Sequence, residues 1–174
     1  MPGISKRLST AALLLAAAAP AAPALAAAAP PKVAAPKTPS VIASRHLWAT
    51  IDACNPADKP RVVGVRGSMP GTGLKTEEMF MRFQIQYQSG TEWKYVPSAD
   101  TSFRDVGSAT YKARQAGQFF TIPAGHYVLR GVVIFQWRRR GHAVLRATRM
   151  TTPSHTSLAG ADPAGYSAAA CALP

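Results

Sequence analysis

Hydrophobic and polar residues alternate with a period of two along much of the chain after residue 40. Between residues 79 and 88 the alternation is clearest, with only Phe80 out of pattern, which predicts a half-buried antiparallel strand. Its apolar face holds Met79, Met81, Phe83, Ile85 and Tyr87, and its polar face holds Arg82, Gln84, Gln86 and Gln88. A turn at 89–91 and a partner strand from Glu92 to Val96, ended by Pro97, complete a predicted hairpin.

A second hairpin is predicted in the C-terminal half of the chain. Its first strand runs from His126 to Arg138, the turn lies at Arg140 and Gly141, and residues 142–151 return as the partner. The face predicted to be buried contains Tyr127, Leu129, Gly131, Val133, Phe135 and Trp137.

Four shorter segments are also predicted to be strands, and no useful window shows helical periodicity. They are residues 47–54, 61–66, 105–112 and 118–122, with a loop at 67–73. Seven or eight short strands separated by frequent turn signals are typical of an all-β antiparallel sandwich or barrel.

The first 26 residues are predicted to be a secretory signal peptide. Lys6 and Arg7 give it a basic start, and the apolar run 11–19 is too short to span a bilayer. Small residues favour cleavage after Ala26, within a few residues. Because the basic pair is Lys-Arg, general secretion is favoured over the twin-arginine route. A retained N-terminal anchor is the alternative.

Two further parts follow the signal peptide. Residues 27–40 are rich in alanine and proline, a composition that favours an extended tether. Residues 41–174 then form one domain of ordinary size, the predicted sandwich. The richness in Ala, Arg, Pro and Gly suggests a bacterial gene of high GC content. We therefore expect a secreted, extracellular bacterial protein, a monomer with no transmembrane segment after cleavage.

The chain contains two cysteines, Cys54 and Cys171, near opposite ends of the predicted domain. In an exported protein such a pair predicts an intrachain disulfide that ties the first strand to the C-terminal tail. An interchain link or free thiols are the alternatives.

The segment 123–130, Pro-Ala-Gly-His-Tyr-Val-Leu-Arg, resembles the start of strand F in immunoglobulin-like and fibronectin type III-like sandwiches. This resemblance implies that the hydroxyl of Tyr127 ties the corner and that Leu129 enters the core. The Cys-Trp-Cys spacing of a true immunoglobulin domain is missing. The tail 162–171 is similar to that of uncharacterised secreted bacterial proteins, a similarity that brings no known activity.

No motif in the sequence predicts catalysis, a metal site or a cofactor. The chain lacks a Gly-x-Ser-x-Gly elbow and a His-Glu-x-x-His pair, and its four histidines are scattered. We therefore predict a non-catalytic binding or structural module. The alternative is a small secreted hydrolase or enzyme inhibitor that acts through the loops at 67–76 or 100–105.

Charge is the one functional signal. The chain has 20 basic and 8 acidic residues, and removal of Lys6 and Arg7 with the signal peptide leaves a net charge of +10. Between residues 126 and 151 lie six arginines and no carboxylate. They are Arg130, Arg138, Arg139, Arg140, Arg146 and Arg149.

Such a cluster predicts contact with an anionic cell-envelope polymer, phospholipid head groups, extracellular nucleic acid without base specificity, or another surface protein. The alternative is a solvated face that keeps the domain soluble and protects its edge strands.

Overall fold

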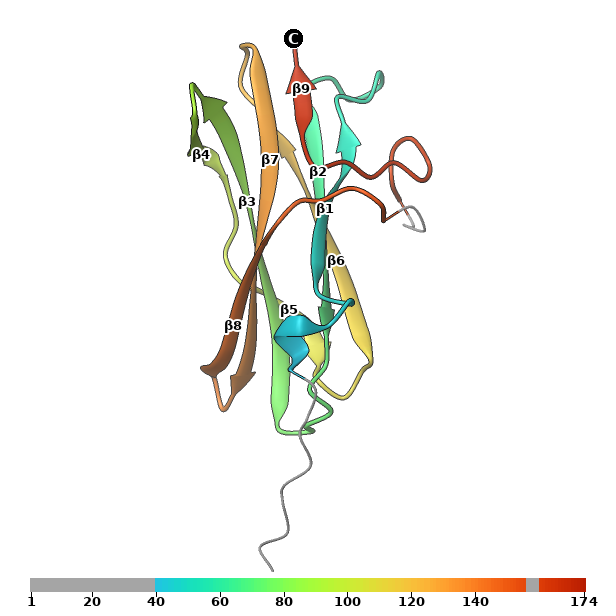
Figure 1. Cartoon of the computed structure of the whole chain (residues 1–174), viewed down its shortest axis with the longest axis vertical. Helices are drawn as coiled ribbons and strands as arrows, with labels where there is room; N and C mark the ends of the chain where they lie inside the picture. Colours follow the sequence, from blue (N-terminus) through green and yellow to red (C-terminus); the bar gives the residue numbers. More distant parts are fainter. Residues whose placement is uncertain (1–39, 156–159) are drawn as a thin grey trace, which may run out of the picture. The chain divides into compact units, whose positions relative to one another are not determined.

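The computed structural model describes residues 40–155 and 160–174. The predicted signal peptide and the tether up to residue 39 lie outside these residues. Within them, nine strands form two antiparallel sheets, which confirms the predicted all-β sandwich (Figure 1). The strands are β1 (Trp48–Cys54), β2 (Val62–Pro70), β3 (Glu77–Ser89), β4 (Glu92–Asp100), β5 (Arg104–Ser108), β6 (Ala113–Thr121), β7 (Tyr127–Arg139), β8 (His142–Met150) and β9 (Cys171–Leu173).

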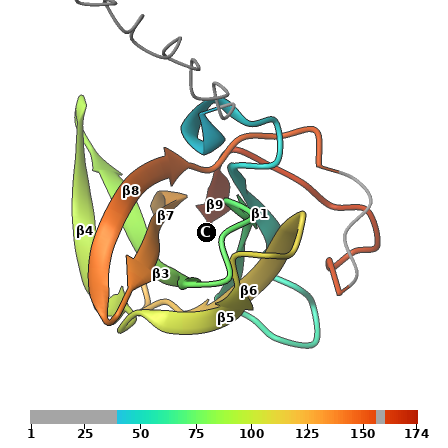
Figure 2. The same cartoon turned by 90° about the horizontal axis from the view of Figure 1, so that it is seen from below.

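The smaller sheet has the order β1-β2-β6, and the larger has the order β4-β3-β7-β8. In the larger sheet, β5 pairs with the first part of β3 and β9 pairs with the first part of β7. Seen from below, β1 and β6 lie on one side of the domain and β3, β7, β8 and β4 on the other (Figure 2). A 3₁₀ turn, η1 (Val41–Ala43), precedes β1. No helix in the described part of the chain has the length and apolar character needed to cross a membrane.

The two longest strands, β3 and β7, form the centre of the larger sheet. They pair over eleven consecutive positions, from Glu77 opposite Arg139 to Tyr87 opposite Leu129. Their predicted inward faces are confirmed between these ends, where the inward side chains have no solvent exposure, whereas Tyr87 and Tyr127 at the end of the ladder are half-buried. The buried residues are Met79, Met81, Phe83, Ile85, Leu129, Val133, Phe135 and Trp137.

The two sheets approach closely where β7 crosses β2. A Cβ atom on Gly131 would lie 2.7 Å from both γ carbons of Val65, so only glycine fits at this position of β7. Further along, the indole Nε1 of Trp137 donates a hydrogen bond of 2.9 Å to the carbonyl of Pro70. The largest buried side chain thus has its polar atom satisfied.

Two predicted strand ends are wrong. β4 does not stop at Pro97 but continues to Asp100, with a register shift against β3 between Gln84 and Gln86. Proline lacks an N–H donor, and an irregular edge strand is where a sheet tolerates it. β2 also runs on to Pro70, so the predicted loop at 67–73 is wrong over its first four residues, which pair with β6.

Two of the shorter predicted strands also have different bounds in the structure. β6 begins at Ala113, five residues before the predicted start, while the segment 105–112 forms a strand only as far as Ser108. The predictions for 47–54 and for the second hairpin agree with β1, β7 and β8 to within one residue.

The C-terminal tail is tied to β1, as predicted. A disulfide joins Cys54 to Cys171, with the Cα atoms 5.6 Å apart, and so links the end of β1 in the smaller sheet to β9 in the larger one. Ile51 and Ala168 exchange two backbone hydrogen bonds of 2.9 and 3.0 Å, and the amide of Asp162 donates to the carbonyl of Asp52. The tail therefore covers the edge of β1 that β2 leaves unpaired.

We expect Phe135→Ala to lower the free energy of unfolding by about 3–5 kcal/mol, because it opens a cavity between the sheets. Phe119→Ala is the matched control, since the ring of Phe119 is 51% exposed. Urea unfolding followed by circular dichroism measures both. Equal losses for the two variants would contradict the assignment of Phe135 to the core.

We expect the double variant Cys54→Ala/Cys171→Ala to be destabilised by up to about 4–5 kcal/mol on the chain-entropy model. The bond closes a loop with a sequence separation of 117 residues. Amide exchange should also become faster at Ile51 and Ala168, where the tail meets β1. Mass mapping of the secreted protein without reductant should recover the two cysteine peptides joined. Two free thiols, or a disulfide-linked dimer, would refute this pairing.

Candidate anion-binding surface

The six arginines predicted to bind anions do not share one surface. Arg130 and Arg138 point to the outer face of the larger sheet, since they alternate with the buried residues of β7. Arg146 is paired with Gln136 across β7 and β8 and therefore shares this face. Arg140 lies in the β7–β8 turn with a φ of +50° and is exposed. The other two arginines point to the inner side of the sheet.

Arg139 forms an ion pair with a buried carboxylate. Its Nη2 lies 2.6 Å from Oε1 of Glu77, whose side chain is only 4% exposed. The hydroxyl of Thr72 donates a second hydrogen bond of 2.7 Å to Oε2 of the same carboxylate. Removal of Arg139 would leave the buried Glu77 carboxylate without a counter-charge. Arg139 therefore has a structural role.

Arg149 also binds within the protein. It is paired with Val133 and therefore lies on the inner side of β8. Its Nη2 donates a hydrogen bond of 2.6 Å to the carbonyl of Ile42, and its Nη1 donates one of 2.9 Å to the carbonyl of Thr148. These bonds hold the η1 turn against the edge of the larger sheet.

Arg138 lies close to two aromatic rings on the outer face. Its guanidinium carbon is 4.1 Å from the ring centre of Phe80 and 4.9 Å from that of Phe103. Its Nε donates a hydrogen bond of 2.9 Å to the side-chain oxygen of Gln136, which is 5% exposed. The aromatic contacts and the hydrogen bond to Gln136 together hold the guanidinium of Arg138 in one orientation.

Arg130 repeats the arrangement near the other end of β7. Its guanidinium carbon lies 4.2 Å from the ring centre of Trp93 on β4. Its Nε donates a hydrogen bond of 2.8 Å to the side-chain oxygen of Gln86, which is 7% exposed. Each arginine therefore combines one buried glutamine with aromatic stacking.

The aromatic and glutamine partners of these arginines were not predicted from the sequence. Phe80 gave a signal, because it is a large aromatic residue at an outward position of a strand whose other outward residues are polar. Phe103 and Trp93 gave none, since only the folded chain brings them beside β7.

The outer face also carries acidic groups. Arg82 donates through Nε to Oδ1 of Asp100 at 2.8 Å, and this hydrogen bond holds the pKa of the Asp100 carboxyl below its ordinary value. Glu78 is paired with Arg138 across β3 and β7. All eight acidic residues lie in the described ranges. Within these ranges, none of their carboxylate oxygens lies within 4 Å of a side-chain nitrogen of Arg130, Arg138, Arg140 or Arg146.

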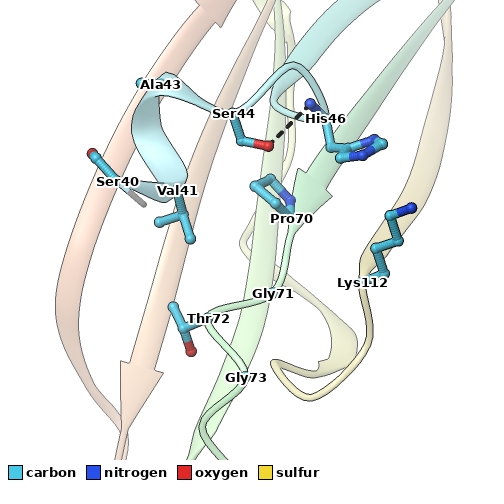
Figure 3. Close-up of a pocket in the computed structure, with 10 residues that line it drawn as sticks. All are labelled: Ser40, Val41, Ala43, Ser44, His46, Pro70, Gly71, Thr72, Gly73 and Lys112. Carbon is cyan, nitrogen blue, oxygen red and sulfur yellow. Dashed lines mark hydrogen bonds between the residues drawn. The ribbon is translucent and has the colours of Figure 1, made fainter. Parts of the chain in front are cut away.

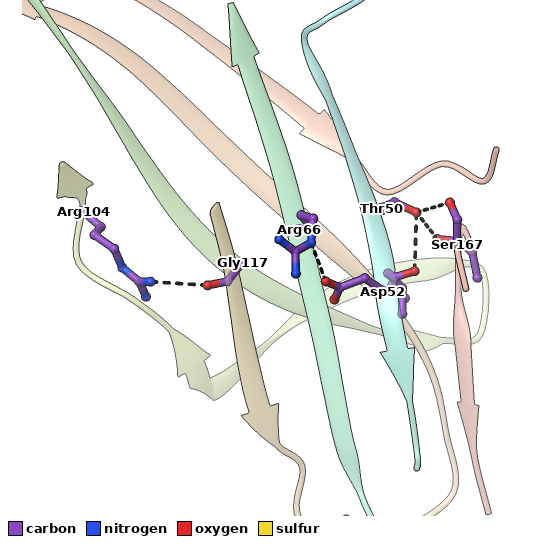
Figure 4. Close-up of polar contacts among 8 residues, drawn as sticks. Thr50, Asp52, Arg66, Arg104, Gly117 and Ser167 are labelled. Carbon is purple, nitrogen blue, oxygen red and sulfur yellow. Dashed lines mark hydrogen bonds and ion pairs between the residues drawn. The ribbon is translucent and has the colours of Figure 1, made fainter. Parts of the chain in front are cut away.

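The smaller sheet carries a buried ion pair of a different kind. Nε of Arg66 lies 2.7 Å from Oδ2 of Asp52, whose side chain is 2% exposed (Figure 4). Beside it, the hydroxyls of Thr50 and Ser167 are 2.7 Å apart, which joins β1 to the tail. This contact, together with the hydrogen bond from the Asp162 amide to the Asp52 carbonyl, holds the tail against β1.

The alternative interpretation as an enzyme or inhibitor assigns activity to two loops, at 67–76 and at 100–105. Of the first loop, residues 71–76 remain outside the strands, and its first three residues line a cavity of about 400 Å³ beside η1, together with Ser44, His46 and Lys112 (Figure 3). In that cavity the Ser44 hydroxyl accepts a hydrogen bond of 3.2 Å from the backbone amide of His46. Among the described residues that line this cavity, none carries a carboxylate.

The acidic residues of the other loop make bonds within the protein. Asp100 is bound to Arg82, and the carboxylate of Asp105 accepts a hydrogen bond from the backbone amide of Gly107. Across residues 40–155 and 160–174, no group of three or more His, Cys, Asp or Glu side chains is placed to hold a metal ion.

A larger cavity of about 570 Å³ lies between β4 and the β6–β7 corner. It is lined by Tyr87, Val96, Pro97, Ser98, Ile122, Pro123 and Tyr127. Apart from Ser98 these described residues are apolar or aromatic and none of them is a cation, so we do not include the cavity in the anion-binding surface.

Comparison with known proteins yields no family model that matches the chain and no curated protein that is significantly similar to it. The assignment of a function therefore rests on the chemistry of the surfaces described above.

The ring of His155 stacks on Trp48, with the ring centres 4.1 Å apart, and burial lowers its pKa from the ordinary value of 6.5. A lowered histidine pKa means that the unfolded chain binds the proton more readily. Stability should therefore decrease as the pH falls below the ordinary value and through the folded pKa.

A pH titration by NMR should place the midpoint of His155 below that of the urea-unfolded chain. His155→Gln should weaken the loss of melting temperature between neutral and mildly acidic pH. A midpoint equal to or above the unfolded value would contradict this prediction.

Proposed function

We propose that the chain is a secreted bacterial binding domain, not an enzyme, which attaches to an anionic polymer of the cell envelope. Its binding surface is the outer face of the larger sheet, with Arg130, Arg138 and Arg146 as the principal cations and Arg140 at the hairpin tip. Arg139 and Arg149 support this surface from the inner side.

We assign the sandwich to the immunoglobulin-like class. In that class, strands A, B and E share one sheet and strands C, F and G the other, which is the order of β1, β2, β6 and of β3, β7, β8. The corner between β6 and β7 corresponds to the E–F corner. There the hydroxyl of Tyr127 donates a long hydrogen bond of 3.4 Å to the carbonyl of Ala124, and Leu129 is fully buried.

Secretion is supported by two independent features. The predicted signal peptide directs export, and the bond between Cys54 and Cys171 is of the kind that persists in oxidising compartments. An extracellular bacterial domain meets envelope polymers whose phosphate and carboxylate groups attract cations.

One observation carries the binding proposal. Arg130 and Arg138 are held on an outward face, yet no carboxylate approaches either within 4 Å in the described part of the chain. A guanidinium that only keeps the protein soluble has no need of a fixed orientation. One that binds an oxyanion gains from it, because less side-chain freedom is lost on binding.

The triple variant Arg130→Ser/Arg138→Ser/Arg146→Ser should elute from immobilised heparin at a clearly lower salt concentration than the parent. Each contact with an anionic group releases counterions, so the salt dependence of binding should also become shallower. Arg139 is left intact because its loss would leave the buried carboxylate of Glu77 without its ion-pair partner.

The matched control is Arg45→Ser/Lys59→Ser/Lys75→Ser, which removes three exposed cations outside this face. We expect the control to elute close to the parent, and both variants to keep a melting temperature near that of the parent. If the two triple variants elute together, only net charge matters and the surface assignment fails.

A further inference from the structure

We propose that Arg130 and Arg138 are two matching clamps, each of which holds one oxyanion of a polymer by two parallel hydrogen bonds. This inference rests on the proposed function and names the chemistry of its ligand. The ligand is a chain molecule with repeated carboxylate, phosphate or sulfate groups.

The orientation of each clamp follows from its bonds inside the protein. In both arginines the Nε donor is already bound to a glutamine oxygen, and one face of the guanidinium lies against an aromatic ring. Gln86 and Gln136 are themselves more than nine-tenths buried and cannot move aside easily. The two Nη atoms are the donors that remain.

These remaining donors are accessible to solvent. Within the described ranges, the one buried side-chain polar atom without a hydrogen-bond partner is Oε1 of Gln84, and no protein acceptor binds the Nη atoms of Arg130 or Arg138. Two Nη atoms side by side match the two oxygens of a carboxylate, or two oxygens of a phosphate or sulfate.

The spacing of the clamps points to a polymer. Arg130 and Arg138 are eight residues apart on the same face of β7, which corresponds to about 26 Å at the rise of an extended strand. A single small anion cannot reach both. Arg146 lies across from Gln136, two residues from Arg138 along β7, and adds a cation that the ligand meets toward the same end of the strand.

Substitution by lysine distinguishes binding through two parallel hydrogen bonds from binding through positive charge alone. Lysine keeps the charge but has no planar fork, so it cannot give two parallel hydrogen bonds. We compare Arg130→Lys/Arg138→Lys with Arg130→Ser/Arg138→Ser in the otherwise unchanged secreted chain. Arg114→Lys is the control, because this arginine also stacks on an aromatic ring, Tyr111 at 3.8 Å, but belongs to β6 in the smaller sheet.

Binding is measured by titration against two probes, polyphosphate and polygalacturonate, at fixed salt concentration. For the better probe, we expect the lysine pair to weaken binding about tenfold or more, close to the loss in the serine pair, while Arg114→Lys binds as the parent does. The probe that binds more tightly identifies phosphate or carboxylate as the preferred group. Inorganic phosphate alone should bind far more weakly than polyphosphate.

Gln86→Leu and Gln136→Leu give a second test, because they keep both charges and all three aromatic contacts. Each should weaken binding if the glutamine positions the guanidinium.

Two results would overturn the inference, in distinguishable ways. If the lysine pair binds like the parent while the serine pair does not, the surface acts through charge alone; the clamps fail and the proposed function remains. If the serine pair also binds both probes like the parent, the proposed function fails with them. Melting temperatures near that of the parent establish that the variants are folded.

Discussion

The register between β3 and β7 determines both the core and the outer surface of this domain. Because side chains alternate across a strand, the pairing that buries Phe83 and Phe135 also places Phe80, Gln86 and Arg138 outside. A slip of one residue would exchange the two faces and put arginine between the sheets. The hydrophobic requirement of the core therefore fixes the positions of the groups that we assign to binding.

The two ends of this ladder are held by different interactions. At one end, Glu77 is buried and bound by Arg139 and Thr72, so the start of β3 and the end of β7 cannot separate without exposing an ion pair. At the other end, β9 pairs with the start of β7, and the disulfide of Cys171 ties it to β1. The hairpin tip with Arg140 thus extends from a sheet that is fastened at both ends.

Alternation in the sequence predicted the central strands and the hairpins, because their inward residues are large and strictly spaced. It did not predict that β4 passes through Pro97, since the tolerance of an edge strand depends on which neighbours it lacks. It also could not predict that Met69 and Pro70 continue β2, because that depends on pairing with β6 and on the indole of Trp137. Strand ends here are decided by tertiary contacts.

The same limit applies to the candidate site. Charge alone identified six arginines as equivalent, whereas cross-strand partners distinguish Arg139, which neutralises a buried acid, from its neighbour Arg138, which stacks on two rings. Those partners come from β3 and the segment after β4, far away in the sequence.

The buried glutamines are the strongest argument that this face is more than a soluble surface. A buried amide oxygen without a hydrogen bond destabilises the fold, and among the described residues Oε1 of Gln84, on this same face, is such an atom. Other positions on the same face are occupied by apolar side chains, such as Val132 and Ile134 in the middle of β7. Gln86 and Gln136 occur instead where they accept from Arg130 and Arg138. In both places the glutamine oxygen holds the guanidinium in one orientation, and the proposed binding of an anion rests on this feature.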